Sequence, residues 1–344
     1  MITEDELAGA LRTIADRAED RDVLTGVRAK RRARRRRRAA GTLAAACVVG
    51  CAAVLGWGGG GPVPRPADAP RQPRDAVERV WPQAVFTLPV GSRPLEAITA
   101  TKVLVWTEPG TLEIHDTAAR RSMPVASLAR PPRLWAADAE RVAWLTGDGH
   151  AWVAPVRTGG RAGRVGPVRG EHVDRLALTA RHVVWSSPLD GVWRAGLDGG
   201  APERVPGGRG LQLVEWPWAT DEPLDARTNP TKVVNLETRR VIEVRPVPGA
   251  EGLRCGPTWC TGTHRGGDAL VQRTDGAWSR THRDWLTGYP YRDRFITGAG
   301  RIHDARTGTT VSFGAGRWSQ GGGVVSWPVD GGVRALNLAA VPPG

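Results

Sequence analysis

The sequence predicts an all-β fold, a β-propeller of seven blades outside the cell, tethered by one N-terminal transmembrane helix. Three observations lead to this prediction. A block of cations precedes an uncharged segment long enough to cross a bilayer, a Gly- and Pro-rich spacer follows, and short strand-like runs then recur about every 37 residues. We therefore divide the chain into a cytoplasmic segment 1–38, a transmembrane helix 39–57, a linker 58–80 and a propeller 81–344.

Residues 28–38 hold nine Lys or Arg side chains in eleven positions, whereas residues 39–57 hold no charge. A helix of nineteen residues rises about 28 Å, close to the roughly 30 Å hydrocarbon core of a bilayer. Because Lys and Arg stay on the cytoplasmic side of a single span, the N-terminus is expected inside. A cleaved signal peptide and a lipoprotein signal ending at Cys51 remain alternatives. The side chains expected at the membrane interface are Arg31, Arg32, Arg34, Arg35, Arg36, Arg37, Arg38 and Trp57.

Charge and composition bear on possible partners. The net charge is +13, but the chain has only three lysines against 45 arginines, a bias that makes the high isoelectric point weak evidence for nucleic acid. Beside an apolar segment, the arginine block fits anionic lipid headgroups better. Residues 3–20 have apolar side chains at helical spacing, which fits either a marginal helix on the membrane or a docking helix for a cytoplasmic regulator.

The strand-like repeat begins near Trp81 and carries the fold prediction. Its anchors follow one another at intervals of 38, 41, 31, 43, 37 and 31 residues. A Gly- or Asp-rich turn and further short runs follow each anchor, so that each unit holds about four strands, as propeller blades do. The anchors are KVLVW, RVAW, HVVW, LVEW, GPTW, RFI and GVVSW, which end at residues 106, 144, 185, 216, 259, 296 and 327.

Two segments depart from the repeat. Residues 217–231 are rich in Pro and Asp and predict a surface loop in the fourth unit. The seventh unit lacks an outer strand, which Ala84 to Val90 could supply from the other end of the domain. In that case Phe86 and Leu88 pack against the final repeat. The count is then seven blades, with six or eight as alternatives.

One unit makes a family resemblance visible. GVWRAGLDGGAPERVPG, residues 191–207, resembles the repeat of WD40-like and TolB-like β-propellers, and the resemblance extends over about residues 84–341. The Gly-His and Trp-Asp signatures of true WD40 repeats are missing from it. The full layout resembles single-pass actinobacterial membrane proteins of unknown function. Some proteins of similar layout accompany extracytoplasmic-function sigma factors, which implies a possible cytoplasmic regulator at residues 1–38.

Cysteine positions agree with an oxidising compartment. Cys255 and Cys260 lie close together in RCGPTWC and predict a disulfide, with two free thiols as the alternative. A metal site is disfavoured because no second Cys or His pair completes a ligand set. Cys47 and Cys51 fall within the predicted span and are expected to be packing residues.

No motif in the sequence indicates a catalytic residue, a metal site or a cofactor. The seven histidines have no ligand spacing, and His115 and His303 occur in the matching segments EIHD and RIHD, which the repeat explains. Most of the fifteen tryptophans occupy repeated strand positions and are expected in the core. Trp216 and Trp218 begin the irregular segment and are the candidate ligand-loop residues.

These features favour a membrane-anchored binding scaffold for an extracytoplasmic protein or cell-wall ligand, not an enzyme. One alternative is a transmembrane signalling or anti-sigma-like regulator that uses residues 1–38. A second alternative is a hydrolase or lyase at the channel mouth, because propeller enzymes draw catalytic residues from scattered loops.

Overall fold

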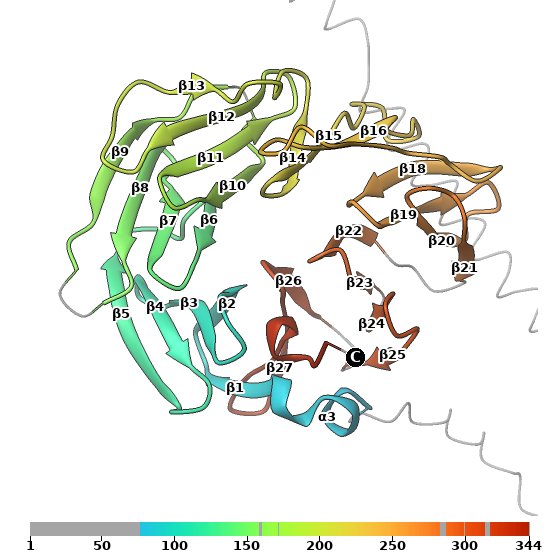
Figure 1. The fold of residues 1–344 in the computed structure, drawn as a ribbon. Coiled ribbons are helices and arrows are strands. Elements are labelled where there is room, and N and C mark those ends of the chain that lie inside the picture. The colour runs from blue at the N-terminus through green and yellow to red at the C-terminus, as the bar shows by residue number, and fades with distance from the viewer. Residues whose placement is uncertain are drawn as a thin grey trace, which may run out of the picture. The chain divides into compact units, whose positions relative to one another are not determined.

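The computed structural model describes residues 76–343 apart from 158–159, 171, 283–286, 299 and 314–316. The predicted cytoplasmic segment, the predicted span 39–57 and most of the predicted linker lie outside these described residues. Among the helices of the described part, none is both long and apolar enough to cross a bilayer. The chain folds into seven four-stranded antiparallel sheets arranged as a ring (Figure 1), a seven-bladed β-propeller as the sequence predicts.

The first three blades follow the chain from the innermost strand outward. Blade 1 comprises β2 (Ser92–Ala97), β3 (Lys102–Thr107), β4 (Thr111–Asp116) and β5 (Arg121–Ser127). Blade 2 comprises β6 (Leu134–Ala137), β7 (Arg141–Leu145), β8 (His150–Pro155) and β9 (Gly163–Pro167). Blade 3 comprises β10 (Arg175–Leu178), β11 (His182–Ser187), β12 (Gly191–Gly196) and β13 (Glu203–Arg204).

The next three blades repeat this order. Blade 4 comprises β14 (Gln212–Glu215), β15 (Trp218–Thr220), β16 (Lys232–Asn235) and β17 (Val241–Glu243). Blade 5 comprises β18 (Ala250–Cys255), β19 (Trp259–His264), β20 (Ala269–Arg273) and β21 (Ser279–His282). Blade 6 comprises β22 (Thr287–Tyr291), β23 (Phe295–Gly298), β24 (Arg301–Asp304) and β25 (Thr310–Ser312).

The apolar anchor runs are buried because each blade is packed between two neighbours. In β7, Val142 and Trp144 join the core shared with blade 1, while the alternating Ala143 and Leu145 join the core shared with blade 3. A strand buried on both faces needs a continuous apolar run rather than an alternating one. The terminal tryptophan of the run is correspondingly buried, with Trp144 1% exposed.

The seventh blade is completed by both ends of the domain. It comprises β26 (Ser319–Gly321), β27 (Val324–Val329), β28 (Gly332–Asn337) and, as its outer strand, β1 (Val85–Pro89). β1 runs antiparallel to β28, with Leu88 opposite Val333. Leu88 is buried in the core between blades 7 and 1, and Phe86 packs against the same core. The predicted closing strand is therefore confirmed.

The predicted linker is wrong in its last residues. Ala76–Val80 form the short helix α3, and the 3-10 helix η1 (Pro82–Ala84) follows it. Val77 and Trp81 are buried with Phe295 and Trp327 in the core between blades 6 and 7. Apolar side chains spaced four residues apart give this segment one face to bury, which the Pro-rich spacer before it lacks.

The fourth blade corrects the sequence prediction in register. LVEW supplies the innermost strand β14, whereas the equivalent anchor runs in blades 1, 2 and 3 supply the second strand. The second strand of blade 4 is β15, which lies inside the segment predicted to be a surface loop. A tight turn with a cis Trp216–Pro217 bond joins the two strands. The irregular segment is therefore shorter than predicted and covers residues 221–231.

Ring closure gives a test with a matched control. Leu88→Asp places a charge in the closed core and should lower the free energy of unfolding by several kcal/mol. Val90→Asp makes the same change two residues later, where the side chain is 75% exposed, and should leave stability within about 0.5 kcal/mol. Urea unfolding followed by tryptophan fluorescence measures both. Equal midpoints for the two variants would contradict the closure.

Candidate binding site in the central channel

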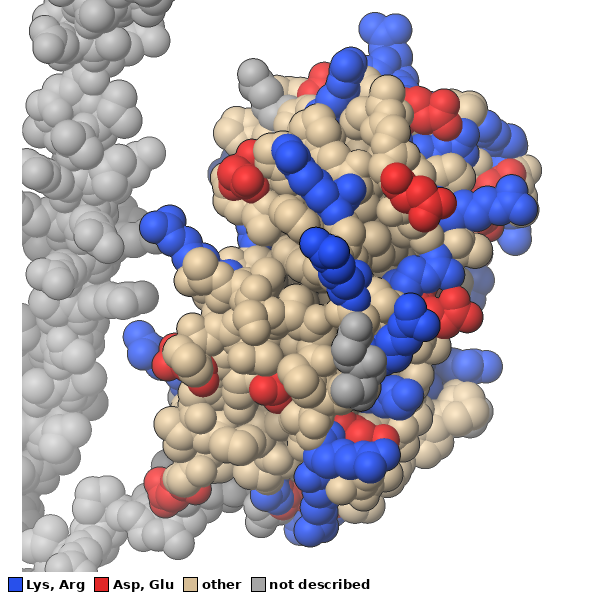
Figure 2. Space-filling view, turned by 90° about the vertical axis from the view of Figure 1, so that its left-hand side faces the viewer, with Lys and Arg blue, Asp and Glu red and all other residues tan. Residues whose placement is uncertain are grey.

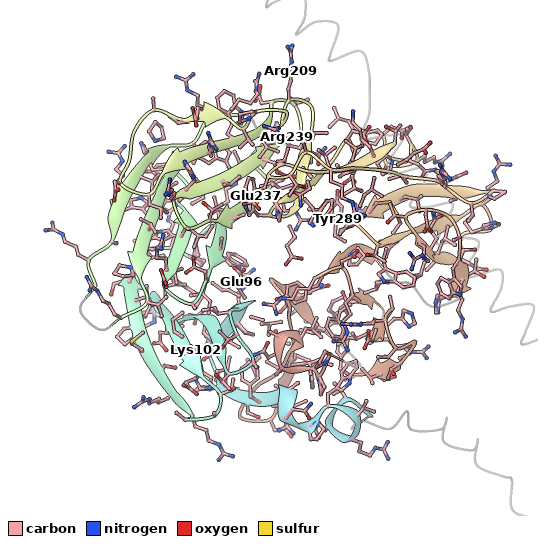
Figure 3. The ribbon with its side chains drawn as sticks, in the orientation of Figure 1. Glu96, Lys102, Arg209, Glu237, Arg239 and Tyr289 are labelled. Carbon is pink, nitrogen blue, oxygen red and sulfur yellow. A yellow bond between two sulfur atoms is a disulfide. The ribbon has the colours of Figure 1, made fainter. Side chains whose placement is uncertain are left out.

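A cavity of about 550 Å³ lies at the centre of the ring. It is lined by the innermost strands of six blades, β2, β6, β10, β14, β22 and β26, and by the turns that follow them. In Figure 3 the labelled Glu96 lies at the inner edge of the ring and points toward its centre. Polar and aromatic side chains from distant parts of the sequence therefore meet in this cavity.

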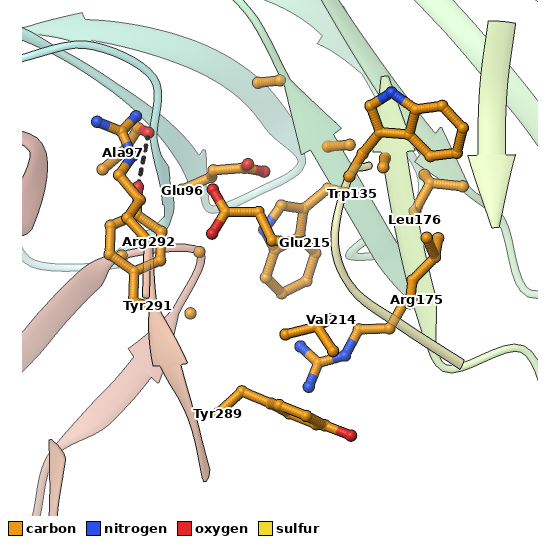
Figure 4. A pocket seen from close by; sticks show the side chains of 18 of the residues that line it. Glu96, Ala97, Trp135, Arg175, Leu176, Val214, Glu215, Tyr289, Tyr291 and Arg292 are labelled. Atoms are coloured by element: carbon orange, nitrogen blue, oxygen red, sulfur yellow. Dashed lines mark hydrogen bonds between the residues drawn. The ribbon is translucent and has the colours of Figure 1, made fainter. Parts of the chain in front are cut away.

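Two carboxylates, those of Glu96 on β2 and Glu215 at the end of β14, point into the cavity (Figure 4). Glu96 is half-buried in the wall of the cavity. This burial, and then the nearby charge of Glu215, raise the pKa of Glu96 to about 8. Burial also raises the pKa of Glu215, against the opposing effect of Arg292.

Arg292 reaches the cavity from an unusual turn between β22 and β23. Arg292 and Asp293 both have a φ of 49°, a left-handed backbone conformation that costs energy for residues other than glycine. The turn sends its two side chains to different places. Arg292 lies with its Cζ 5.4 Å from the Tyr291 ring centroid, while the Asp293 carboxylate accepts backbone N–H bonds from Thr258 and Trp259 of blade 5, each 3.0 Å long.

Three consecutive glycines allow blade 7 to approach this site closely. A Cβ on Gly322 would lie 2.6 Å from Glu96 Cγ, and a Cβ on Gly323 would overlap the Tyr291 ring. Both glycines also have positive φ. The backbone at these positions therefore forms part of the wall that holds Glu96 and Tyr291 in place.

Another part of the cavity carries Asp174 and Arg175, at the start of β10. Ser186 donates a hydrogen bond of 2.8 Å to Asp174, and the Cζ of Arg175 lies 5.0 Å from the Tyr289 ring centroid. Burial lowers the pKa of Arg175, although Asp174 and Glu222 partly oppose this shift. Glu222 in turn forms an ion pair of 3.6 Å with Arg254. Two carboxylates and two guanidiniums thus balance one another, and of these four residues Asp174 and Arg175 line the cavity whereas Glu222 and Arg254 do not.

The two candidate ligand-loop tryptophans are separated by the structure. Trp216 lines the cavity and donates a hydrogen bond of 3.0 Å from its indole nitrogen to Glu237. Trp218 instead begins strand β15 and packs against the core that blades 4 and 5 share. Trp216 therefore lines the cavity, whereas Trp218 lies in a strand and not in a loop, because the strand begins earlier than expected. That either side chain binds a ligand stays a prediction.

The predicted disulfide is present between Cys255 and Cys260, with an S–S distance of 2.04 Å. The two residues face each other across β18 and β19, and both are fully buried. The hairpin turn that they close is the one whose backbone Asp293 caps. Asp293 therefore connects this disulfide-bonded hairpin to Arg292, the residue before it in the chain, which faces the cavity.

The repeated histidines occupy equivalent positions on the third strands of blades 1 and 6. His115 Nδ1 lies 3.2 Å from the Ser122 hydroxyl, and His303 Nδ1 lies 2.9 Å from the Thr310 hydroxyl. In both blades the partner is the facing residue on the outer strand. Among the described residues, no cluster of His, Cys, Asp and Glu could hold a metal ion.

Glu96, Glu215 and Arg292 are site residues that the sequence alone did not indicate. Each lies on or just after an innermost strand, in the segments RPLEA, LVEW and YPYRD. The available signal was a charged residue at or just after the end of a mostly apolar strand, at three positions separated by 119 and 77 residues. That signal becomes specific only after the strand order of each blade is known.

Comparisons with known proteins find only distant structural similarity. No protein-family model matches it, and no curated protein does. BamB from Moraxella catarrhalis has 16% identity and a TM-score of 0.38 over 69% of this chain and 79% of its own. The designed protein Ika8 has 13% identity, a TM-score of 0.39, and coverage of 69% and 80%. A chain of a nidogen/laminin complex has 14% identity and a TM-score of 0.39, and the match covers 65% of this chain and 94% of its own. The assignment of the fold therefore rests on the strand pairing within the seven sheets.

The raised pKa of Glu96 predicts a pH dependence of stability. The folded state keeps the Glu96 proton up to about pH 8, whereas the unfolded chain releases it near the ordinary value of 4.5. The free energy of unfolding should therefore fall between these pH values, by on the order of 2 kcal/mol after allowance for channel water. Glu96→Gln should flatten that decline in urea titrations, and Glu140→Gln on the exterior should not. A wild-type slope in Glu96→Gln would show that Glu96 does not cause it.

Proposed function

We propose that this protein is a membrane-anchored, extracytoplasmic binding scaffold for a protein or cell-wall ligand, and that the central cavity is its binding site. The observation that carries the proposal is the cavity itself, in which carboxylates, arginines and aromatic rings converge from five of the six blades that line it. Binding sites are typically concave, largely preformed and equipped with a few convergent polar groups.

The rigidity of the ring supports binding rather than a moving lid. The cavity side chains stand on innermost strands or on tight turns between paired strands, and each blade is packed on both faces. Sites on such elements hold their groups more precisely than sites on long loops. A rigid site loses little conformational entropy when a ligand binds.

The exterior differs from the cavity in its charge pattern. In the face shown in Figure 2, basic and acidic side chains are interspersed over a broad uncharged surface. Interspersed charges are typical of a solvated surface and do not select a partner of one sign. The cavity, with Glu96 and Glu215 against Arg292, has a more distinctive chemistry.

The extracytoplasmic location is supported by two features of different origin. The disulfide between Cys255 and Cys260 is of a kind that persists in oxidising compartments and is rare in cytosol. The arginine block before residues 39–57 favours an N-terminus inside the cell. Both features support an outer location for the residues after the predicted span.

One observation favours a second candidate function, a hydrolase or lyase. Glu96 and Glu215 are neighbouring carboxylates, and Glu96 keeps its proton near neutral pH. Pairs of carboxyl groups with different protonation states can serve as general acid and general base. An enzyme would convert its ligand into product, and both Glu96→Gln and Glu215→Gln would abolish that turnover. A scaffold would release its ligand unchanged.

Topology is tested with fusions to the full chain. A reporter enzyme active only outside the cytoplasm should be active when fused after Gly61, and the purified protein should retain Met1 or Ile2 as its first residue. Replacing the arginines at 34–38 with glutamine should weaken the orientation, because these charges hold the N-terminus inside. A mature N-terminus between residues 44 and 54 would show cleavage or lipidation instead of an anchor.

Binding at the cavity is tested in cells with a photo-crosslinking residue in place of Val214, which lines the cavity. We expect covalent adducts with an extracytoplasmic protein or wall fragment, and a large loss of those adducts when Glu215→Gln is added. The same probe in place of Asp198, on the exposed turn after β12, serves as the control. Adducts that are identical from both positions, or none from position 214, would contradict the proposed site.

A further inference from the structure

The charges around Glu96 and Glu215 do not balance. The charged and titratable groups that face Glu96 are Glu215 from β14, and Arg292 and Tyr291 from β22 and its turn. Asp293 adds a further negative charge near Glu215. Arg292 thus stands as one positive charge against Glu96 and Glu215. In another part of the cavity Asp174 and Arg175 are balanced by each other and by Glu222 and Arg254, which lie outside the lining.

Neither cavity carboxylate is engaged by another side chain. Within the part of the chain that the structure describes, Glu96 and Glu215 form no ion pair and accept no side-chain hydrogen bond. Their hydrogen-bonding neighbours are the backbone N–H groups of Ala137 and Arg292. An enclosed carboxylate that points into a cavity and lacks a side-chain partner keeps acceptor capacity for a ligand.

The walls beside these carboxylates suit a cation as well. The rings of Trp135 and Tyr291 border the cavity, and each already attracts a guanidinium of the protein, Arg93 at 5.9 Å and Arg292 at 5.4 Å from the ring centroid. Aromatic faces attract ammonium and guanidinium groups through the ring quadrupole. Carboxylates and aromatic faces together favour an organic cation over a metal ion.

We propose that the cavity binds an organic cation, an ammonium or guanidinium group, between Glu96 and Glu215. This inference deepens the proposed binding function and rests on it. The group could belong to a free small amine or to a Lys or Arg side chain of a peptide, and the chemistry of recognition is the same. A second, balanced charge cluster at Glu222 provides a matched comparison within the same molecule.

Binding should be coupled to the release of a proton. Below pH 8 the Glu96 carboxyl is mostly protonated, so that the proton supplies the positive charge that the empty cavity lacks. A bound cation takes this role, Glu96 ionises, and close to one proton leaves for each cation bound at neutral pH. The total charge within the cavity is then unchanged. Affinity should therefore rise with pH up to about 8.

The experiment is titration calorimetry of the full chain in detergent. The probes are butylguanidinium, a blocked Gly-Arg-Gly peptide and, as neutral counterparts, butanol and blocked Gly-Gln-Gly. We expect both cationic probes to bind at least tenfold more tightly than their neutral counterparts, and about tenfold or more tightly at pH 8.5 than at pH 6.5. Buffers of different ionisation enthalpy should report about one proton released at pH 7. The tighter of the two cationic probes then identifies the source of the group.

Variants separate the site from general electrostatics. Glu96→Gln should weaken binding of the cationic probes at least tenfold at pH 8.5 and remove the pH dependence. Glu222→Gln also neutralises one partly buried carboxylate, but that carboxylate is paired with Arg254 and does not line the cavity, so affinity should stay within about twofold. Melting curves verify that both variants fold.

Two results would overturn the inference. One is that cationic and neutral probes bind alike, and the other is that Glu96→Gln and Glu222→Gln have the same effect. If either result is found but cavity adducts still form from position 214, the proposed binding function stands and its ligand is not a cation. Loss of those adducts as well would overturn the proposed function itself.

Discussion

The pairing of β1 with β28 is the constraint on which the rest of the structure depends. Every blade is covered on both faces only when the last blade packs against the first. Blade 7 needs residues 85–89 as its outer strand. The pairing joins segments almost 250 residues apart and so brings the two ends of the domain together. It also fixes the point at which the N-terminal part of the chain leaves the propeller, because α3 and η1 pack next to the same seam.

Closure accounts for the composition of the strands. Since every blade has two neighbours, its middle strands are buried on both faces and need unbroken apolar runs, as in β7. The innermost strands are different, because their inner edge meets the cavity rather than another sheet. A charge such as Glu96 or Glu215 is therefore tolerated at the end of an innermost strand, where the opposite charge of Arg292 partly compensates its burial.

The sequence was sufficient for the fold because burial on both faces leaves a strong signal. The runs ending in Trp106, Trp144 and Trp185 mark second strands, and the missing outer strand of the last repeat indicates β1. The register predicted for blade 4 was wrong because LVEW, an apolar run ending in Trp216, has the pattern of a second strand although it lies on the innermost strand. The site was not predictable in this way. Glu96, Glu215 and Arg292 share no motif, and their proximity follows from the closed ring rather than from local sequence.

Ring closure and the cavity are linked through blade 7. The carbonyl oxygen of Gly322 accepts a hydrogen bond of 2.7 Å from the backbone N–H of Ala97, the residue after Glu96. The carbonyl oxygen of the next glycine, Gly323, accepts one of 2.9 Å from Leu338, just beyond β28. The glycine segment thus joins the closing blade to the innermost strand of blade 1, beside Tyr291. The geometry that encloses the Glu96 carboxylate is therefore set by the same seam that completes the propeller.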